Sequence, residues 1–451
     1  VKIGAEANIT HADGSAAQLY DTLPQAFESG VQKSGDVVEI LTSQVTAVDN
    51  KTLVGGVTLK TKADDKGVQH TYKAEGADAT ISVDTTGKKI TLNKGTLEVS
   101  DNAPVTVKVG ETTQEITATG NNGSKPKFVV PESGDDTTPY VLLPSGGTVT
   151  IDGVVYTGTA GAKVYIPDGF QDDKVTKAEL PKGKSVKYKD KDITHENDTT
   201  GEDTEKVVVK RENGKVSVEV PHGHKASAFD YEVENKSTAN SITVKEPSGT
   251  AGKEARPSVT ATSGDKFTAT KSGENSDTHD YTAADGMTTF YLGKFKVTVN
   301  AGESATASPE NAGEKYYGET VEVTFTPKEN HELDAEKVSV TADGTVVTGA
   351  AQKEENGNVK VTATVTGEMV IKAEADRLMS ELTVNLSGEK GKVTVGYTDK
   401  DGSQQTETLT ETGKVTVPRN GEVTFTFAPE DASAKSLSVL TELQKDNEDV
   451  F

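Results

Sequence analysis

Carboxylates are the commonest side chains in this sequence that could do chemistry. A glycoside hydrolase needs two carboxylates at a defined separation, and 71 aspartate and glutamate residues supply such pairs along the whole chain. A polysaccharide lyase also needs a basic residue beside its carboxylate or metal cluster. No arginine precedes Arg211, however, and the lysines before Gly169 lie in alternating, strand-like contexts. Because no pair stands apart from the others, we predict that the protein is not an enzyme.

Two histidines form a local motif that could bind a metal ion. His222 and His224 are two residues apart, a spacing that sets both imidazoles on one face of a strand and suits a pair of metal ligands. No third ligand stands out, because His195, His279 and His331 lie in unrelated segments of the sequence. We therefore favour an exposed turn as the explanation of this pair.

Structural calcium is the other cation that the sequence suggests. Asp399, Asp401 and Gly402 have the order found in the middle of a calcium loop, but the other ligands and the terminal glutamate are missing. Pairs of aspartates at 135–136 and 172–173 could hold calcium at domain borders. Solvated loop acids explain both pairs better. We predict no cofactor, and structural calcium stays open as an alternative.

Exposed aromatic rings are well suited to binding a glycan or a protein. Phe229 and Tyr231 are two residues apart and so share one face of a strand. Tyr316 and Tyr317 must point to opposite faces, which leaves one buried and one free. These four residues are our candidate binding residues. Filling of the core is the competing use of each ring in a chain without tryptophan.

Charge and composition exclude several classes of partner. A formal net charge of -23 repels the phosphate backbone that a nucleic-acid-binding protein must neutralise, so neither nucleic acid nor an anionic membrane surface is an expected partner. The absence of cysteine excludes disulfides and thiol catalysis. The sequence contains no run of about 20 apolar residues, the length needed to cross a bilayer. We therefore expect any membrane anchor to lie outside these residues. We also expect a monomer.

The elements that must position these residues are short and extended. We expect a helix at 22–27, where a threonine cap and an early proline accompany apolar residues on one face. From 35 to 169, brief alternating segments, one of them at 53–60, are separated by turn residues. Such rungs fit the stacked coils of a β-solenoid, and a pair of sandwiches is the alternative. Further on, Asn213-Gly214 joins two alternating runs and predicts a hairpin.

The C-terminal third contains an internal repeat. Residues 318–327 (GETVEVTFTP) are echoed at 420–429 (NGEVTFTFAP), and each segment is followed by a matching strand, at 337–340 and at 436–439. This self-similarity predicts two related small β-modules of about 85 and 75 residues.

Two parts of the sequence resemble segments of bacterial cell-surface proteins. Residues 20–27 (YDTLPQAF) and 35–41 (GDVVEIL) resemble the opening of right-handed β-helix domains. There a short helix caps the coil and a Gly-Asp-Thr-Ile strand forms the first rung; Val37 stands where threonine is usual. Residues 317–327 are similar to Ig-like and internalin-type repeats of Gram-positive ectodomains, without their usual aromatic pair. The resemblance implies export and a role in display or adhesion, and it implies no particular ligand.

We therefore predict an elongated, multidomain all-β protein. Its expected parts are a helix-capped β-solenoid-like domain at 1–172, a hairpin-rich domain at 173–292 and two related Ig-like modules at 293–377 and 378–451. The expected function is that of an adhesin at the cell surface or in the cell wall, which binds a host protein such as a mucin or an immunoglobulin in preference to a glycan. A passive stalk or S-layer-like component and a β-helix polysaccharide lyase or hydrolase are the alternatives.

Overall fold

The structure is a computed structural model of residues 1–451. It describes residues 4–121, 123–132, 137–143, 148–168, 176–197, 202, 204–274, 276–347, 349–386, 391–400 and 402–429, with the backbone of 444–445 and 448–449. The regular structure of this part is almost wholly β-strand, with three short 3₁₀ helices, so the predicted all-β class is confirmed. None of the helices described here has the length and apolar character needed to span a membrane.

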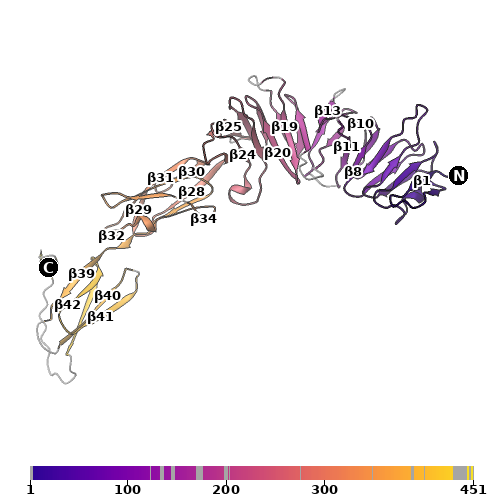
Figure 1. Ribbon diagram of the computed structural model, residues 1–451. Helices are drawn as coiled ribbons and strands as arrows, with labels where there is room; N and C mark the ends of the chain where they lie inside the picture. Colours follow the sequence, from indigo (N-terminus) through magenta and orange to yellow (C-terminus); the bar gives the residue numbers. More distant parts are fainter. Residues whose placement is uncertain are drawn as a thin grey trace. The chain divides into compact units, whose positions relative to one another are not determined.

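Two compact units make up the chain (Figure 1). Unit 1 comprises residues 1–250 and 254–292, and unit 2 comprises residues 251–253 and 293–451. Each unit buries its own set of valine, alanine and phenylalanine side chains. The finer division into four modules stays a prediction.

The first part of unit 1 is a network of short strands joined through one long strand. Residues 90–94 of β8 pair with β7 and β9, and its residues 95–99 pair with β6 and β11. Most pairs are antiparallel, but β3–β5 and β8–β9 are parallel. The strands are β1 (Ala7–Thr10), β2 (Gln18–Tyr20), β3 (Val37–Ile40), β4 (Val48–Leu53), β5 (Thr58–Lys60), β6 (Thr71–Ala74), β7 (Ala79–Val83), β8 (Ile90–Val99), β9 (Val105–Val109), β10 (Thr112–Gly120) and β11 (Lys127–Val130).

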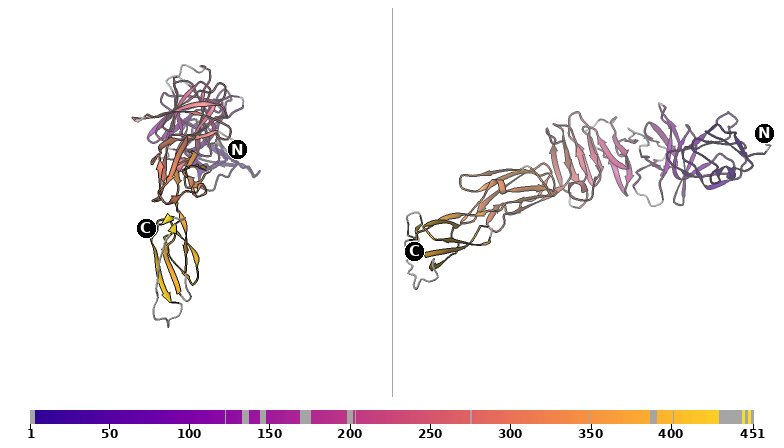
Figure 2. Two further views of the ribbon diagram at one scale, coloured as in Figure 1. Left: turned by 90° about the vertical axis from the view of Figure 1, so that its left-hand side faces the viewer. Right: turned by 60° about the horizontal axis from the view of Figure 1, so that its bottom comes forward.

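The second part of unit 1 consists of two sheets between which the chain alternates (Figure 2). From β16 onward it crosses to the facing sheet, makes a hairpin there and crosses back, and the rings of Phe267 and Phe290 meet between the sheets with centroids 5.6 Å apart. The first sheet contains β13 (Thr148–Ile151), β14 (Val154–Gly158), β16 (Thr176–Leu180), β19 (Val207–Glu212), β20 (Lys215–Val220), β23 (Ile242–Lys245), β24 (Ser258–Thr260) and β27 (Thr289–Tyr291). The second sheet contains β12 (Tyr140–Leu142), β15 (Lys163–Tyr165), β17 (Ser185–Tyr188), β18 (Lys191–His195), β21 (Lys225–Ala228), β22 (Tyr231–Asn235), β25 (Lys266–Lys271) and β26 (Thr278–Thr282). The hairpin predicted at Asn213-Gly214 is confirmed as β19–β20.

One type of corner recurs along unit 1. In each corner the fourth residue donates its main-chain N–H to the carbonyl of the first. The third residue has a positive φ, and its N–H donates to a carbonyl beyond the corner, in or next to an adjacent strand. Glycine is suited to this conformation because it has no Cβ to clash. The corners are Lys33–Asp36, Val54–Val57, Ser100–Ala103, Thr159–Ala162, Pro181–Lys184, Pro221–His224 and Thr262–Asp265.

Two local predictions about this part need correction. The segment 53–60 is not one strand, because Gly56, with φ of 86°, makes the second corner between β4 and β5. The expected helix is a single 3₁₀ turn, η1 (Leu23–Phe27), in which the Gln25 side chain accepts a hydrogen bond from the N–H of Thr22. The chain leaves the helix at Glu28 in an extended conformation, and Leu23, Ala26 and Phe27 form the buried face of the turn. A further turn, η2 (Gly252–Ala255), precedes β24.

Unit 2 begins with two facing sets of strands. In the described part, one sheet has the order β30-β28-β37-β33-β34 with β28 parallel to β37, and the other has the order β29-β31-β36-β35. Phe295, Val323 and Phe325 are fully buried among them. The elements are β28 (Lys294–Asn300), β29 (Ala305–Ser308), β30 (Gly313–Tyr316), β31 (Thr320–Pro327), β32 (His331–Glu332), η3 (Ala335–Lys337), β33 (Ser339–Ala342), β34 (Thr345–Val346), β35 (Ala350–Lys353), β36 (Val359–Thr364), β37 (Met369–Lys372) and β38 (Asp376–Arg377).

The strands between Met379 and Pro429 enclose a small valine core. Val384, Val393 and Val415 are buried there, with partly exposed phenylalanines at the margin. Both halves of the sequence repeat are strands, β31 and β43, but 337–340 is split between η3 and β33, and 436–439 lies outside the described residues. The elements are β39 (Met379–Val384), β40 (Gly391–Thr398), β41 (Gln404–Leu409), β42 (Gly413–Pro418), β43 (Val423–Pro429), β44 (Gln444–Lys445) and β45 (Glu448–Asp449).

Alanine at the corner glycines should destabilise unit 1 by amounts that depend on the local space. A Cβ on Gly264 meets nothing within 4 Å, so Gly264→Ala should cost only the left-handed backbone, about 1–2 kcal/mol. A Cβ on Gly35 would lie 2.9 Å from the Cβ of Ala12, so Gly35→Ala should cost more. Gly391→Ala, with open space and no positive φ, is the control and should be close to neutral. Urea unfolding followed by circular dichroism measures the free energy of unfolding of each variant. Equal decreases in this free energy for all three variants would contradict the importance of the corners.

Candidate functional site

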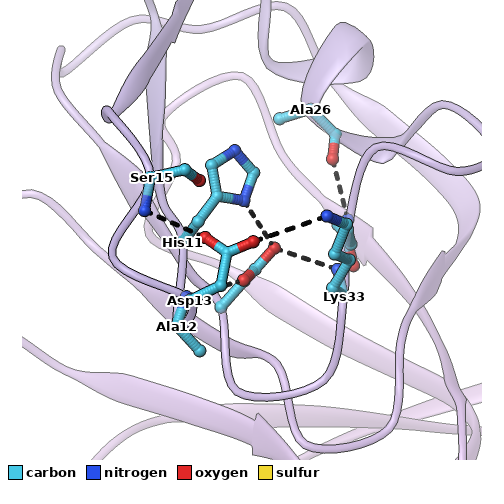
Figure 3. A network of polar contacts seen from close by, with 8 residues as sticks. His11, Ala12, Asp13, Ser15, Ala26 and Lys33 are labelled. Carbon is cyan, nitrogen blue, oxygen red and sulfur yellow. Dashed lines mark hydrogen bonds and ion pairs between the residues drawn. The ribbon is translucent and has the colours of Figure 1, made fainter.

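A buried carboxylate organises the start of unit 1. Asp36 ends the first corner and is 1% exposed. Its Oδ1 accepts a hydrogen bond from the N–H of Ala12 (3.0 Å), its Oδ2 accepts one from the N–H of Lys33 (2.9 Å), and Nδ1 of His11 lies 3.0 Å from Oδ2. Figure 3 shows His11, Ala12 and Lys33 gathered at this site, with Asp13 facing the ammonium group of Lys33. The carboxylate thus fastens the loop after β1 to the first corner.

The surroundings of Asp36 favour its charged form. Burial raises the pKa of a carboxyl group, but the hydrogen bonds from the two main-chain N–H groups and from His11 outweigh it, so the pKa of Asp36 is lowered. A histidine beside a buried carboxylate is also half of a general-base pair. Because Asp36 directs two of its contacts to main-chain N–H groups, we assign it a structural role.

A later corner contains the same device, and sequence reasoning missed it. Asp265 holds the position equivalent to Asp36 and is 5% exposed. Its Oδ2 accepts a hydrogen bond from the N–H of Thr262 (3.0 Å), and its Oδ1 accepts one from Nδ2 of Asn240 (3.1 Å). The Gly-Asp dipeptide shared by the two corners was the available signal.

Phe229 lies at a hairpin tip. Phe229 and Asp230, between β21 and β22, have φ of 51° and 69°, the conformation of a type I′ turn. A phenylalanine with positive φ is an outlier, and its ring packs edge-on against Tyr188, with centroids 6.4 Å apart. Tyr231 begins β22 and is 8% exposed. The two rings therefore do not form the shared strand face expected from their spacing.

A buried glutamate lies beside this tip. Glu246 is 7% exposed, and its Oε2 accepts hydrogen bonds from the hydroxyl of Tyr188 (2.8 Å) and Nζ of Lys189 (2.9 Å). Its Oε1 accepts one from the N–H of Val216 (2.8 Å). Burial raises the pKa of Glu246, but these donors outweigh it, and the pKa is lowered. Lys189 also has a positive φ and forms the tip of the β17–β18 hairpin, so two tips of the second sheet present a cation and an aromatic ring.

The other two predicted binding residues lie in unit 2. Tyr316 ends β30, and Nζ of Lys294 lies 5.2 Å from the centre of its ring. The ring of Tyr317 lies 6.0 Å from that of Phe295. Both tyrosines are half-buried. The expectation that one of the two is buried and the other exposed is therefore wrong.

Three histidines and a glutamate meet at another corner, contrary to the expectation that His195 lies apart from His224. Nδ1 of His195 is 2.7 Å from the carbonyl oxygen of Leu180, and its Nε2 is 3.1 Å from Nδ1 of His224. Nε2 of His224 is 3.3 Å from Oε2 of Glu205, and Nδ1 of His222 is 3.8 Å from the same oxygen. Both His195 and His224 are 0% exposed. Sequence spacing could not show this meeting, because it depends on the pairing of β18 with β21.

The described residues give little support to a metal centre. They contain no group of three or more His, Asp or Glu side chains arranged to hold a metal ion. Asp399 is used in the β40–β41 turn, where Oδ1 accepts a hydrogen bond from the N–H of Ser403 (2.8 Å) and Oδ2 accepts one from Nε2 of Gln405 (2.7 Å). Asp401 and the aspartate pairs at 135–136 and 172–173 lie outside the described residues.

A polar hollow of about 500 Å³ lies on the first part of unit 1. Asn93 donates from Nδ2 to the hydroxyl of Ser82 at its margin (2.9 Å). The hollow is lined by Asn50, Asn93, Lys108, Val109, Gly110, Glu111, Val130, Pro131, Glu132 and Tyr165. Amide, ammonium and carboxylate groups could hydrogen-bond a polar ligand such as a saccharide.

No family model matches the chain, and no curated protein or solved structure is significantly similar to it.

Replacing Asp36 should weaken unit 1 most at neutral pH. Asp36→Asn keeps the size of the side chain but puts an amide nitrogen where the carboxylate accepts hydrogen bonds, which should cost about 1–3 kcal/mol. Because the pKa of Asp36 is lowered on folding, its contribution is present above its unfolded pKa, about 3.9, and is lost as the pH falls through the lower folded value. The difference in unfolding free energy between the two proteins should therefore shrink below pH of about 4. A difference that is the same at pH 3 and pH 7 would contradict this assignment.

Proposed function

We propose that the protein is a non-enzymatic, extracellular binding protein of a bacterial cell surface or cell wall. The observation that carries the proposal is the use made of buried ionisable side chains. Among the described residues, five of the six buried Asp, Glu, His and Arg side chains bind main-chain groups: Asp36, His195, Arg211, Glu246 and Asp265. The sixth, His224, binds His195. None of these six lines the polar hollow, where the buried Tyr165 is the one ionisable side chain of the described core, whereas enzymes place ionisable groups with shifted pKa values in their clefts.

The finer fold that we propose agrees with this role. The recurring corner supports a β-solenoid-like arrangement of stacked coils in unit 1, and the facing sheets of unit 2 support Ig-like modules. Such coils and modules present long outer surfaces and place their loops at the edges. The sequence resemblance to bacterial surface proteins points to the same setting.

We place the binding surface at the hairpin tips of the second sheet in unit 1. A bulky residue with positive φ costs free energy, and such strain is common at functional positions. Phe229 carries this cost, and the neighbouring tip presents Lys189. Lys191, next to the first tip, forms an exposed ion pair with Asp230 of the second, so the two tips lie beside each other. An aromatic ring with adjacent charges favours a protein partner over a glycan.

A passive stalk and a polysaccharide lyase are the competing functions, and one experiment separates them. The full chain is titrated over arrays of purified mucins, immunoglobulins and glycans, and it is incubated with a panel of polysaccharides. Saturable binding to a protein supports the proposal. Absence of any saturable partner supports the stalk, and turnover of a polysaccharide supports the lyase; either result would overturn the proposal.

Phe229→Asn should separate binding from stability. Asparagine adopts the left-handed conformation more readily than phenylalanine, and this gain offsets the lost ring contact with Tyr188, so stability should change by less than about 1 kcal/mol. Loss of an aromatic anchor should weaken partner binding at least about tenfold. Asn213→Asp, at the equivalent tip position of the β19–β20 hairpin, is the control and should bind normally. Unchanged affinity of Phe229→Asn would exclude this tip from the interface.

A further inference from the structure

Four asparagines of the chain precede a glycine, the pair that loses its side-chain amide most readily without an enzyme. They are Asn122, Asn213, Asn356 and Asn420. In this reaction the main-chain nitrogen of the following residue attacks the side-chain carbonyl carbon of the asparagine, and glycine hinders the approach least because it has no Cβ. Asn122 lies outside the described residues, and each of the other three lies exposed in a turn.

The turn at Asn356 is held by hydrogen bonds to both reacting groups. Oδ1 of Asn356 accepts a hydrogen bond from the N–H of Asn358 (2.9 Å), and its Nδ2 donates to Oε2 of Glu354 (3.4 Å). The N–H of Gly357 donates to the carbonyl of Glu354 (3.0 Å). An N–H in such a bond must be released before it can lose its proton to base, as amide hydrogen exchange shows. The side chain and the nitrogen are therefore both kept from reacting.

The turn at Asn420 is held in a similar way. The N–H of Gly421 donates to the carbonyl of Pro418 (3.0 Å), and the carbonyl of Asn420 accepts a hydrogen bond from Nη2 of Arg377 (3.4 Å). The nitrogen that would attack is again engaged, and the peptide unit that contains it is fixed on both sides.

The turn at Asn213 lacks these restraints. Asn213 and Gly214 have φ of 50° and 71° and join the paired residues Glu212 and Lys215 in a two-residue type I′ turn. In the part of the chain that the structure describes, neither the side chain of Asn213 nor the N–H of Gly214 has a hydrogen-bond partner. Both residues are exposed. Water therefore reaches the nitrogen, and the side chain of Asn213 can rotate toward it.

We propose that Asn213 is a site of spontaneous deamidation in the folded protein. The nitrogen of Gly214 gives its proton to hydroxide and forms a bond to Cγ of Asn213, the Cγ–Nδ2 bond breaks, and the amide nitrogen leaves as ammonia. Water then opens the five-membered imide at one of its two carbonyl carbons. Attack at Cγ gives aspartate, and attack at the main-chain carbonyl carbon gives isoaspartate. The reaction consumes one water molecule and needs no oxidant or metal.

The modification adds a carboxylate to a hairpin tip whose strands are held elsewhere. β19 stays paired with β16, and β20 stays paired with β23, so the sheet does not depend on this tip. The new charge follows Glu212, and Oδ2 of Asp168 lies 3.9 Å from the position that a Cβ on Gly214 would take. The surface around the tip therefore becomes more acidic with time. This inference is independent of the proposed binding function, which we place at tips of the second sheet.

The test follows the three turns in the full-length protein, kept folded at mildly alkaline pH for several weeks. Peptide mass spectrometry measures the conversion of amide to acid at each asparagine, and electron-transfer fragmentation separates aspartate from isoaspartate. Asn213 should convert at least about tenfold faster than Asn356 and Asn420, because local opening must precede reaction at the other two turns. In urea the three rates should converge, because each asparagine then has only its glycine neighbour in common with the others.

Matched variants assign the signal to one turn. In Asn213→Gln, the longer side chain would have to close a six-membered ring, so conversion at this position should disappear. Asn420→Gln is the control and should leave conversion at Asn213 unchanged. Conversion of Asn213 in the folded protein no faster than that of Asn356 and Asn420 would overturn the proposal. The same advantage for Asn213 in urea would overturn it as well, because the local sequence and not the fold would then set the rate.

Discussion

The left-handed residue at the third position of each corner is the constraint on which unit 1 depends. In every corner after the first, which lies between β2 and β3 of one sheet, it turns the chain from one sheet toward the next. Its own N–H bonds to a carbonyl in or next to an adjacent strand, from 2.7 Å at Gly183 to 3.3 Å at Gly35. One conformational requirement thus sets both the direction of the chain and the register between neighbours. A thin apolar core can then suffice, because each short strand is fixed at its corner as well as by its side chains. In a chain that is one-third hydrophobic, this hydrogen bonding matters more than it does in a protein with a large core.

The fourth residue of the corner is where the sequence varies and where polar chemistry enters. The side chains of Asp36 and Asp265 accept a hydrogen bond from the first N–H of their own corner, and the ring of His224 contacts that of His195. At Lys184 the main-chain carbonyl accepts a hydrogen bond from the N–H of His195. Burial makes each such group costly unless it is fully bonded. The same position therefore serves as a fastening point in two corners and as a contact between two buried imidazoles in another.

Features of the fold and the site that depend on residues close in sequence could be predicted, and those that depend on contacts between distant residues could not. Strand content and the Asn213-Gly214 hairpin depend on neighbours in the sequence and were predictable. The break at Gly56 was not predictable, because a glycine within an alternating run is compatible with a strand, and the corner depends on the hydrogen bond from the N–H of Gly56 to the distant carbonyl of Ala74 in β6. Spacing alone predicts that Phe229 and Tyr231 share a strand face, but the adjacent tip places Phe229 in a left-handed turn. The meeting of His195 and His224 depends on strand pairing over 29 residues, which single-sequence patterns do not contain.

The corner constraint is tested most directly at a position where only the backbone conformation changes. A methyl group added at Gly264 would meet open space, and Gly391 offers the same space without the left-handed backbone. Hydrogen exchange of the full chain should show that Gly264→Ala lowers protection at the N–H groups of residues 264 and 283, which bond to the adjacent strand and corner, with no change for Gly391→Ala. Full protection at both amides in Gly264→Ala would contradict the claim that the left-handed residue holds neighbouring strands and corners together.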